Sequence, residues 1–378
     1  MSCESGLPKR PRVPKHFNIV PMSDGRIQLR SAHKTVLLSG KSIRAVEKLL
    51  GLLDGTRSVP EITGCFPDIP EDEVLMTLRK LADRGLVEDA TEAADGKPSK
   101  PSAAYDAQKT FFSLTSRDGR ALQAVVQGCR VAVFGLGRVG SHLVAALARA
   151  GVGGITAVDE TVVEESLPVS GGLYLREDVG RPRGDAMVER VRDINPSTVC
   201  EIASAEPEDD SQMARIVGEA SLAVVCRDNP EVAIYRSVNR AALREGVPWL
   251  RVSLEGFEAQ LGPAVIPYET ACYTCYELRT KANWSYYEEN LAFEEHLLSE
   301  RPKADYGCLA PASGFLGNLA ALESLKILTG FAPPMTCGRL LTFNISTFDA
   351  HLHEVLKLPR CPSCGATVRG PSATLWFL

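Results

Sequence analysis

Four of the eleven cysteines lie in two pairs whose spacing is that of metal ligands. The stretch "ACYTCYE" places Cys272 and Cys275 three residues apart, and "RCPSCG" does the same with Cys361 and Cys364. Two such turns can present four thiolates to one tetrahedral zinc ion, which then has no open position for water. We therefore expect a structural Zn2+ site rather than a catalytic one. A thioredoxin-like redox pair, the other use of C-x-x-C, lacks its usual local context here. Among the remaining cysteines, only Cys308, in a loop-like stretch, is a candidate reactive thiol.

A second candidate site is the glycine-rich stretch "VAVFGLGRVG". Gly135, Gly137 and Gly140 follow a strand-like apolar run and precede a helix-like segment. In a nucleotide-binding fold these glycines permit a tight turn, a close approach of the backbone to a phosphate, and packing of the helix on the strand. Asp159 ends the next strand-like run, where its carboxylate can accept hydrogen bonds from ribose hydroxyls. The pattern predicts a nucleotide-binding fold, with a structural turn that has lost its ligand as the alternative.

Strand-like and helix-like segments alternate from about residue 128 onward. Runs such as "RVAVF", "ITAVD" and "LAVVC" are short and rich in β-branched residues, and segments with helical periodicity, such as "SHLVAALARAG", separate them. This alternation is typical of a doubly wound parallel sheet with right-handed crossovers. The sequence therefore predicts a Rossmann-like α/β domain whose glycine loop lies at the carboxyl end of the first strand.

The first ninety residues have a different organisation. "HFNIVPM", "RIQLRS" and "KTVLLSG" indicate three short strands, and three helix-like segments follow, the last over Glu71–Arg84. This order predicts a small winged-helix-like α+β domain over residues 1–90. Residues 91–104 are rich in Ala, Ser, Pro and Gly, so we expect a flexible linker there, before the α/β domain at 105–378.

Composition narrows the class of protein. The 378 residues carry a net charge of −5, which argues against a general nucleic-acid binder. No stretch is long and apolar enough for a membrane span, and the first residues lack the apolar core of a secretory signal, so we expect a cytoplasmic protein. The first fifty residues hold ten Lys and Arg against three Asp and Glu. That excess is either a solvated surface or a surface that docks an acidic partner.

Over residues 105–370 the sequence resembles the adenylating ThiF/MoeB/ubiquitin-activating superfamily. The resemblance rests on "VAVFGLGRVGSHLVAALARAGVGGITAVD", "VGRPRGDAMVERVRDINP", "VCRDNPEVAIYRSVNRAALREGVPWL" and the two cysteine pairs. It implies an ATP-dependent enzyme that activates a carboxylate as an acyl-adenylate, and a homodimer. It also matches Asp228, in "CRDN", to the acid that approaches the metal and the phosphates, and places Arg183 where the family has a lysine.

This chain departs from the family pattern after Asp159. The position of the family's second acid is Thr161, and no Asn, Arg or Gln occurs between Asp159 and Gly172, although the family uses Asn and Arg there to contact ATP phosphates. Charge stabilisation is usually the largest catalytic contribution. The resemblance therefore implies a degenerate adenylation site with altered ATP contacts, in which Asp228 and Arg183 are the remaining candidate catalytic residues.

The first ninety residues resemble PqqD-like peptide-recognition domains. Together the two halves are similar to the leader-peptide-binding, ThiF-like partner proteins of thiazole/oxazole-modified (TOMM) ribosomal peptide pathways, which work with a YcaO-type cyclodehydratase. The resemblance implies that the leader of a precursor peptide adds to an edge strand at Lys34–Gly40, with the helix Glu71–Arg84 as the other wall. The expected peptide-binding residues are Thr35, Val36, Leu37, Leu38, Leu75, Leu78, Arg79 and Arg84.

Three other functions compete with this interpretation. An active adenylating enzyme, acting on a peptide or on the C-terminal carboxylate of a sulfur carrier, would use the same glycine loop. A nicotinamide-dependent dehydrogenase would use it as well, but the paired cysteines and the "CRDN" segment argue against that class. A nucleic-acid-binding winged helix has only the basic excess of the first fifty residues in its favour.

Overall fold

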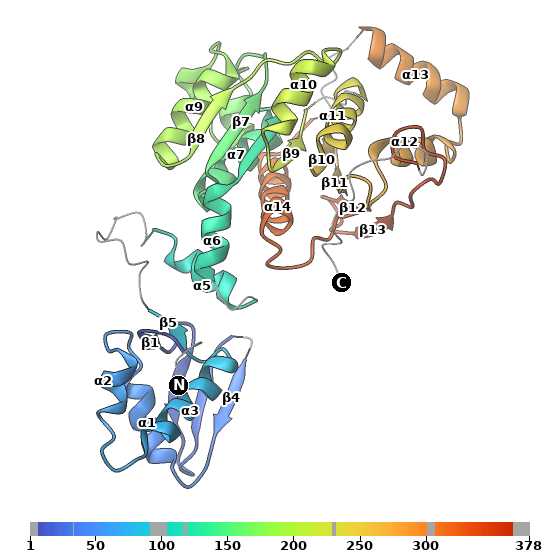
Figure 1. Ribbon diagram of the computed structural model, residues 1–378. Coiled ribbons are helices and arrows are strands. Elements are labelled where there is room, and N and C mark those ends of the chain that lie inside the picture. Colours follow the sequence, from blue (N-terminus) through green and yellow to red (C-terminus); the bar gives the residue numbers. More distant parts are fainter. Residues whose placement is uncertain are drawn as a thin grey trace. The chain divides into compact units, whose positions relative to one another are not determined.

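The computed structural model describes residues 7–32, 34–90, 104–115, 119–228, 232–300 and 307–365. The chain divides into two compact units, residues 1–120 and 121–378 (Figure 1). Except for residue 104, the segment predicted as a linker lies outside the described residues.

The N-terminal unit contains a three-stranded antiparallel sheet in the order β2-β3-β4, so that β4 lies at an edge, as the sequence predicts. Three helices follow the sheet, and a short pair of strands, β1 with β5, joins the segment before the sheet to the segment after the third helix. The elements are β1 (Pro11–Arg12), β2 (Asn18–Pro21), β3 (Ile27–Arg30), β4 (Thr35–Leu38), α1 (Ile43–Leu52), α2 (Val59–Thr63), α3 (Glu71–Asp83), β5 (Glu88–Asp89) and α5 (Asp106–Ser113).

One face of this sheet and one face of each main helix form the core of the N-terminal unit. Ile27 and Leu29 of β3 are buried, and α3 turns Val74, Leu78 and Leu81 toward them. The three acidic residues in the first turn of α3 are favourable because the helix dipole is positive there. Leu78 is only 1% exposed, so its prediction as a peptide contact is wrong: helical spacing places it on the same buried stripe as its two apolar neighbours.

The second unit is built on an eight-stranded sheet in the order β13-β12-β11-β10-β9-β6-β7-β8. Strands β8, β7, β6, β9 and β10 run parallel, which confirms the predicted Rossmann-like α/β fold. Strands β11, β12 and β13 extend the sheet in antiparallel fashion. The strands are β6 (Arg130–Phe134), β7 (Gly154–Val158), β8 (Val199–Ile202), β9 (Leu222–Val225), β10 (Trp249–Glu255), β11 (Glu258–Val265), β12 (Arg339–Asn344) and β13 (Ala350–Glu354).

Helices cover both faces of this sheet (Figure 1). Helix α14 packs on α7, while α10 and α11 pack on each other over an apolar cluster that also holds the four paired cysteines. The helices are α6 (Gly119–Gly128), α7 (Arg138–Ala150), α8 (Leu167–Ser170), the 3-10 helix η1 (Arg176–Asp178), α9 (Arg183–Ile194), α10 (Asp210–Gly218), α11 (Val232–Glu245), α12 (Tyr273–Lys281), α13 (Tyr287–Glu300) and α14 (Ala310–Thr329). None of the described helices is long and apolar enough to cross a membrane.

The order of the parallel strands determines where a ligand can bind. The chain moves outward from β6 to β7 and β8, and then returns to build β9 and β10 on the other side of β6. Ligands of doubly wound sheets bind at such a switch point, beyond the carboxyl ends of the strands. Here the glycine loop follows β6 and residues 226–228 follow β9, so both lie at this switch point.

Candidate functional site

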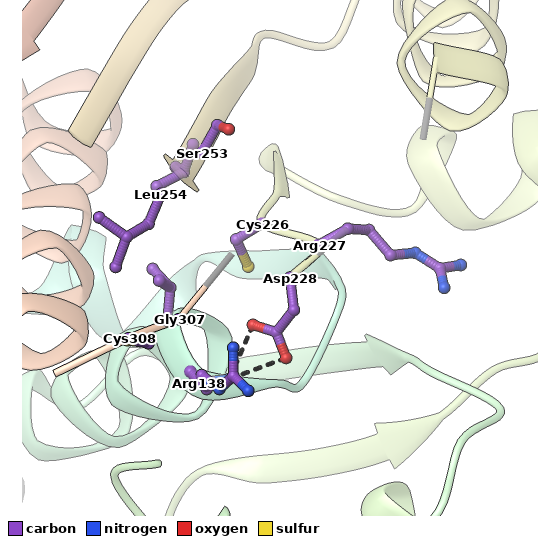
Figure 2. A pocket seen from close by; sticks show the side chains of 10 residues that line it. Arg138, Cys226, Arg227, Asp228, Ser253, Leu254, Gly307 and Cys308 are labelled. Atoms are coloured by element: carbon purple, nitrogen blue, oxygen red, sulfur yellow. Dashed lines mark hydrogen bonds between the residues drawn. The ribbon is translucent and has the colours of Figure 1, made fainter. Parts of the chain in front are cut away.

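A small pocket lies at the carboxyl ends of β9 and β10 (Figure 2). Its walls come from four segments: the start of α7, the residues after β9, the end of β10 and the loop before α14. Arg138 and Asp228 face each other in it, whereas the side chain of Arg227 extends away from Asp228. Cys308 also lines the pocket, but burial raises the pKa of its thiol, so this cysteine is not activated toward nucleophilic attack.

The glycines of the loop are required by contacts within the protein. Gly135 has φ +106°, in the region that favours glycine, and a Cβ atom there would lie 2.7 Å from the carbonyl oxygen of Cys226. A Cβ atom on Gly137 would lie 1.8 Å from Oδ2 of Asp228, and one on Gly140 would lie 2.0 Å from the carbonyl oxygen of Gly135. The space beside Gly137 is therefore filled by the carboxylate of Asp228.

Asp228 caps the N-terminus of α7. The backbone N–H of Arg138 donates to its carboxylate, at 2.9 Å from Oδ1 and 3.2 Å from Oδ2. The start of a helix favours an anion because its N–H groups point outward and the helix dipole is positive there. Burial raises the pKa of Asp228 in spite of the nearby arginines. A phosphate group would have to compete with this carboxylate for the helix terminus.

Asp159 has both of its carboxylate oxygens engaged. Oδ2 accepts from the backbone N–H of Leu136 at 2.7 Å and from Arg183 at 3.3 Å. Oδ1 accepts from the backbone N–H and the hydroxyl of Thr161, at 2.9 and 2.5 Å. Burial alone would raise the pKa of Asp159, but the Arg183 guanidinium and these hydrogen bonds hold it below its usual value. Thr161 stands at the position of the family's second acid, and here it donates two hydrogen bonds to Asp159, the first acid.

Arg183 bridges the two acids. Its buried side chain donates from Nε to the carbonyl oxygen of Val162 at 3.1 Å, and its Nη1 lies 3.3 Å from Asp159 and 3.9 Å from Asp228. The sequence predicted these three residues separately, and the fold brings them together. Tyr174, which the sequence analysis missed, donates its hydroxyl to the carbonyl oxygen of Leu136 at 2.7 Å, and burial raises its pKa.

Gly137→Ala tests this internal arrangement. The new Cβ atom cannot coexist with Asp228 at its present place, so the variant should lose the cap of α7 and become less stable by about 2 kcal/mol or more. Urea unfolding of the full chain measures this change. Gly128→Ala is the matched control, since an added Cβ there meets no atom within 4 Å. Equal stability of the two variants would show that Asp228 does not occupy the place described.

The four paired cysteines form one buried cluster between the start of α12 and residues 361–364. The Sγ–Sγ distances are 3.9 Å for Cys272–Cys275, 3.7 Å for Cys272–Cys361 and 3.6 Å for Cys275–Cys364. A tetrahedron with Zn–S bonds of about 2.3 Å has edges of about 3.8 Å. The backbone N–H of Leu358 points at the sulfur of Cys275 at 3.4 Å, the kind of outer contact that orients a metal ligand. The cluster therefore fits a zinc ion with four thiolate ligands.

The predicted peptide-binding residues of β4 and α3 lie on neighbouring elements. Nζ of Lys34 donates to the carbonyl oxygen of Arg84 at 2.6 Å, which places the start of β4 beside the end of α3. Val36 and Leu38 turn toward the core, while Leu37 points outward and is 48% exposed. The side chains of Leu75 and Arg79 on α3 are half-buried, and the side chain of Arg84, which directly follows the helix, is exposed.

The hydrogen-bond pattern of the hairpin shows which amides face the open edge. The N–H of Ser31 donates to the carbonyl oxygen of Lys34 at 2.8 Å, next to the first pair of β3 and β4. Hydrogen-bonded pairs alternate along an antiparallel ladder, so the next such pair is Leu29 with Val36. The backbone groups of Thr35 and Leu37 consequently point away from β3, toward the edge where another strand can add.

Comparison with known proteins agrees with this architecture. The model of the ThiF family matches residues 105–366. The sulfur carrier protein ThiS adenylyltransferase of Escherichia coli is 27% identical over 242 residues, which cover 64% of this chain and 88% of that protein. The microcin C7 biosynthetic enzyme MccB of E. coli, solved in complex with N-formylated MccA, superposes with a TM-score of 0.69 at 19% identity and covers 94% of this chain and 99% of its own. PaaA superposes with a TM-score of 0.70 at 19% identity, and the match covers 91% of this chain and 100% of PaaA. The fold is thus shared along most of the chain, the N-terminal unit included.

Proposed function

The chain belongs to the ThiF family, and from that premise we propose that it recognises a ribosomally made precursor peptide and presents it to a YcaO-type cyclodehydratase for azoline formation. The leader of the peptide adds to the open edge of β4 beside α3. The ThiF domain serves as a scaffold held together by structural zinc, and the partner enzyme uses the ATP.

The observation that carries this proposal is the open edge of β4. An incoming strand gains main-chain hydrogen bonds from Thr35 and Leu37, and side-chain contacts with the neighbouring helix supply selectivity. Exposed Lys80 lies on α3 and exposed Arg84 directly follows its last residue, and both can attract an acidic leader, with an affinity that falls as salt increases. A structure of MccB, which shares the fold of this chain, holds N-formylated MccA, in agreement with a polypeptide ligand.

The arrangement of the nucleotide site supports a scaffold role for the ThiF domain. Asp159, the candidate ribose acid, already accepts four hydrogen bonds from the chain. Asp228 holds the helix terminus that a phosphate would need, and Arg183 lies between the two carboxylates and forms ion pairs with both. Residues 160–172 supply no Arg, Asn or Gln for phosphate contacts. Each of these groups would have to change partners before ATP could bind.

Two measurements on the purified full chain test the proposal. Titration of a fluorescein-labelled precursor peptide should show saturable binding by fluorescence polarisation. The same mixture should catalyse no exchange of radioactive pyrophosphate into ATP, because the groups that stabilise a transferring phosphoryl are missing. Absence of binding would contradict the recognition role, and robust exchange would contradict the scaffold role.

An active adenylating enzyme is the second candidate. The specific observation in its favour is that the glycine loop, Asp159, Arg183 and Asp228 meet at one switch point, as an ATP site of this family would require. Peptide-dependent exchange that is abolished by Asp228→Ala would select this function. In the scaffold proposal, Asp228→Ala instead leaves the activity of the reconstituted cyclodehydratase largely intact.

A further inference from the structure

The attachment of α13 to the ThiF domain centres on one buried carboxylate. Among the described side chains of α13 only that of Glu294 is buried, at 8% exposure. Glu294 accepts from Arg236 of α11 at 2.5 Å and from Lys281, the last residue of α12, at 2.7 Å. Both of these cations also pair with Glu277 of α12. The ion pairs hold α13 beside α11 and α12 (Figure 1) and determine which face of the helix points outward.

The outward face of α13 carries carboxylates that have no ion-pair partner. Glu288, Glu289 and Glu295 are exposed, and among the described side chains of α13 only Glu294 takes part in a salt bridge. Glu288 and Glu289 lie in the first turn, where the helix dipole favours an acid, but Glu295 lies in the middle of the helix and gains nothing from the dipole. Residues 282–300 contain no Lys or Arg. The face is therefore negatively charged and has no counter-ion on its own segment.

Aromatic rings lie beside these carboxylates. Tyr286 is 70% exposed, and Tyr287 and Phe293 are each 52% exposed. The N–H of Asn290 donates to the carbonyl oxygen of Tyr286 at 3.0 Å, so Tyr286 continues the first turn of the helix. Tyr286, Glu289 and Phe293 consequently share one stripe, because residues three and four apart are neighbours on a helix surface. Aromatic side chains are enriched in protein interfaces, which makes this stripe a candidate contact surface.

Rings combined with carboxylates are suited to binding a cation, and the protein already contains one example. Nζ of Lys281 lies 5.7 Å from the centroid of the Trp284 ring and also pairs with Glu294. A guanidinium fits such a combination best, because it stacks on an aromatic face and donates two parallel hydrogen bonds to a carboxylate. The outward face of α13 therefore has the chemistry of a surface that receives arginine side chains.

We propose that the outward face of α13 is the surface on which the partner enzyme docks, through a segment that bears arginine. The face is made by Tyr286, Tyr287, Glu288, Glu289, Phe293 and Glu295. The inference rests on the proposed function, in which a YcaO-type cyclodehydratase receives the peptide. Charge argues against the leader as the occupant: the leader expected beside α3 is acidic, and this face repels an acidic segment. The chain thus uses two surfaces of opposite charge for its two partners.

Biolayer interferometry tests the proposal, with the full chain immobilised and the purified YcaO-type cyclodehydratase that modifies the precursor peptide in solution. The double variant Glu288→Lys, Glu289→Lys should raise the dissociation constant at least about tenfold, because two attractions become repulsions. Phe293→Ser should raise it about fivefold, since it removes an aromatic contact but leaves every charge and the ion pairs of Glu294 in place. Both variants should bind the labelled precursor peptide as tightly as the wild type, which is the control for folding.

The double variant Glu164→Lys, Glu165→Lys is the matched control. These two glutamates are also adjacent and exposed, and their reversal changes the net charge of the chain by the same amount. The control should bind the enzyme within about twofold of the wild-type affinity. Wild-type affinity in both α13 variants, or an equal loss in the control, would overturn docking on α13 and leave the proposed function in place. A wild-type chain that does not bind the enzyme would contradict the proposed function itself.

Discussion

Cys361→Ser should release the zinc and lower the melting temperature of the chain by roughly 10 °C. The four thiols lie at the spacing of a zinc tetrahedron, and metal binding contributes directly to folding in such sites. The ion would join segments 89 residues apart, from the start of α12 to the C-terminal turn. Losing about 4 kcal/mol corresponds to this shift for a unit of this size. Elemental analysis and thermal unfolding, with and without a chelator, measure both quantities.

Cys200→Ser is the control for this zinc prediction. Cys200 is half-buried on β8 and takes no part in the cluster, so its variant should keep one zinc per chain and nearly the wild-type melting temperature. Chelator should lower the melting temperature of wild type and control alike but leave Cys361→Ser unchanged. Metal-free wild-type protein, purified under reducing conditions, would refute the prediction.

Local patterns in the sequence were sufficient to predict most of the strands. Parallel strands such as β6 and β9 are buried on both faces, so they are continuous apolar runs that can be recognised without knowledge of their neighbours. Strand β13 is different: its five residues, Ala350–Glu354, are all exposed, and Leu352 is its one large apolar residue. It is a strand because β12 supplies its hydrogen bonds, and the sequence pattern does not reveal that pairing.

The sequence singled out the residues that meet at the switch point, but it did not predict the contacts between them. A recognisable sequence motif contains each of Asp159, Arg183 and Asp228, and the switch point of the sheet brings the three residues together. Their mutual bonding depends on side-chain conformations, which no spacing rule specifies. Tyr174 shows the same limit, since no motif marks it. Likewise, helical periodicity identified the apolar stripe that contains Leu78, but not whether the stripe faces the core or a ligand.

Leu37→Pro should weaken binding of the labelled precursor peptide at least tenfold while leaving the unit folded. The N–H of Leu37 points to the open edge, so proline removes a donor that an added strand needs and keeps the bonds between β3 and β4. The pyrrolidine ring also obstructs the approach of a strand. Leu37→Ala separates the contribution of the N–H from that of the side chain, because it removes the exposed side chain but retains the N–H. This variant should weaken peptide binding less than Leu37→Pro does.

Ile19→Pro on the opposite edge of the same sheet is the matched control. The bond from the N–H of Met22 to the carbonyl oxygen of Arg26 sets the ladder between β2 and β3, so that Val20 pairs with Gln28 and the N–H of Ile19 points outward. Both variants therefore lose one outward donor and one exposed apolar side chain, 39% exposed for Ile19 and 48% for Leu37. The β4 edge lies beside the end of α3, as the Lys34–Arg84 bond indicates. If the control loses as much affinity as Leu37→Pro, damage to the sheet explains both results. If Leu37→Pro binds as tightly as the wild type, the peptide does not add to β4, and the recognition surface must be sought elsewhere in the chain.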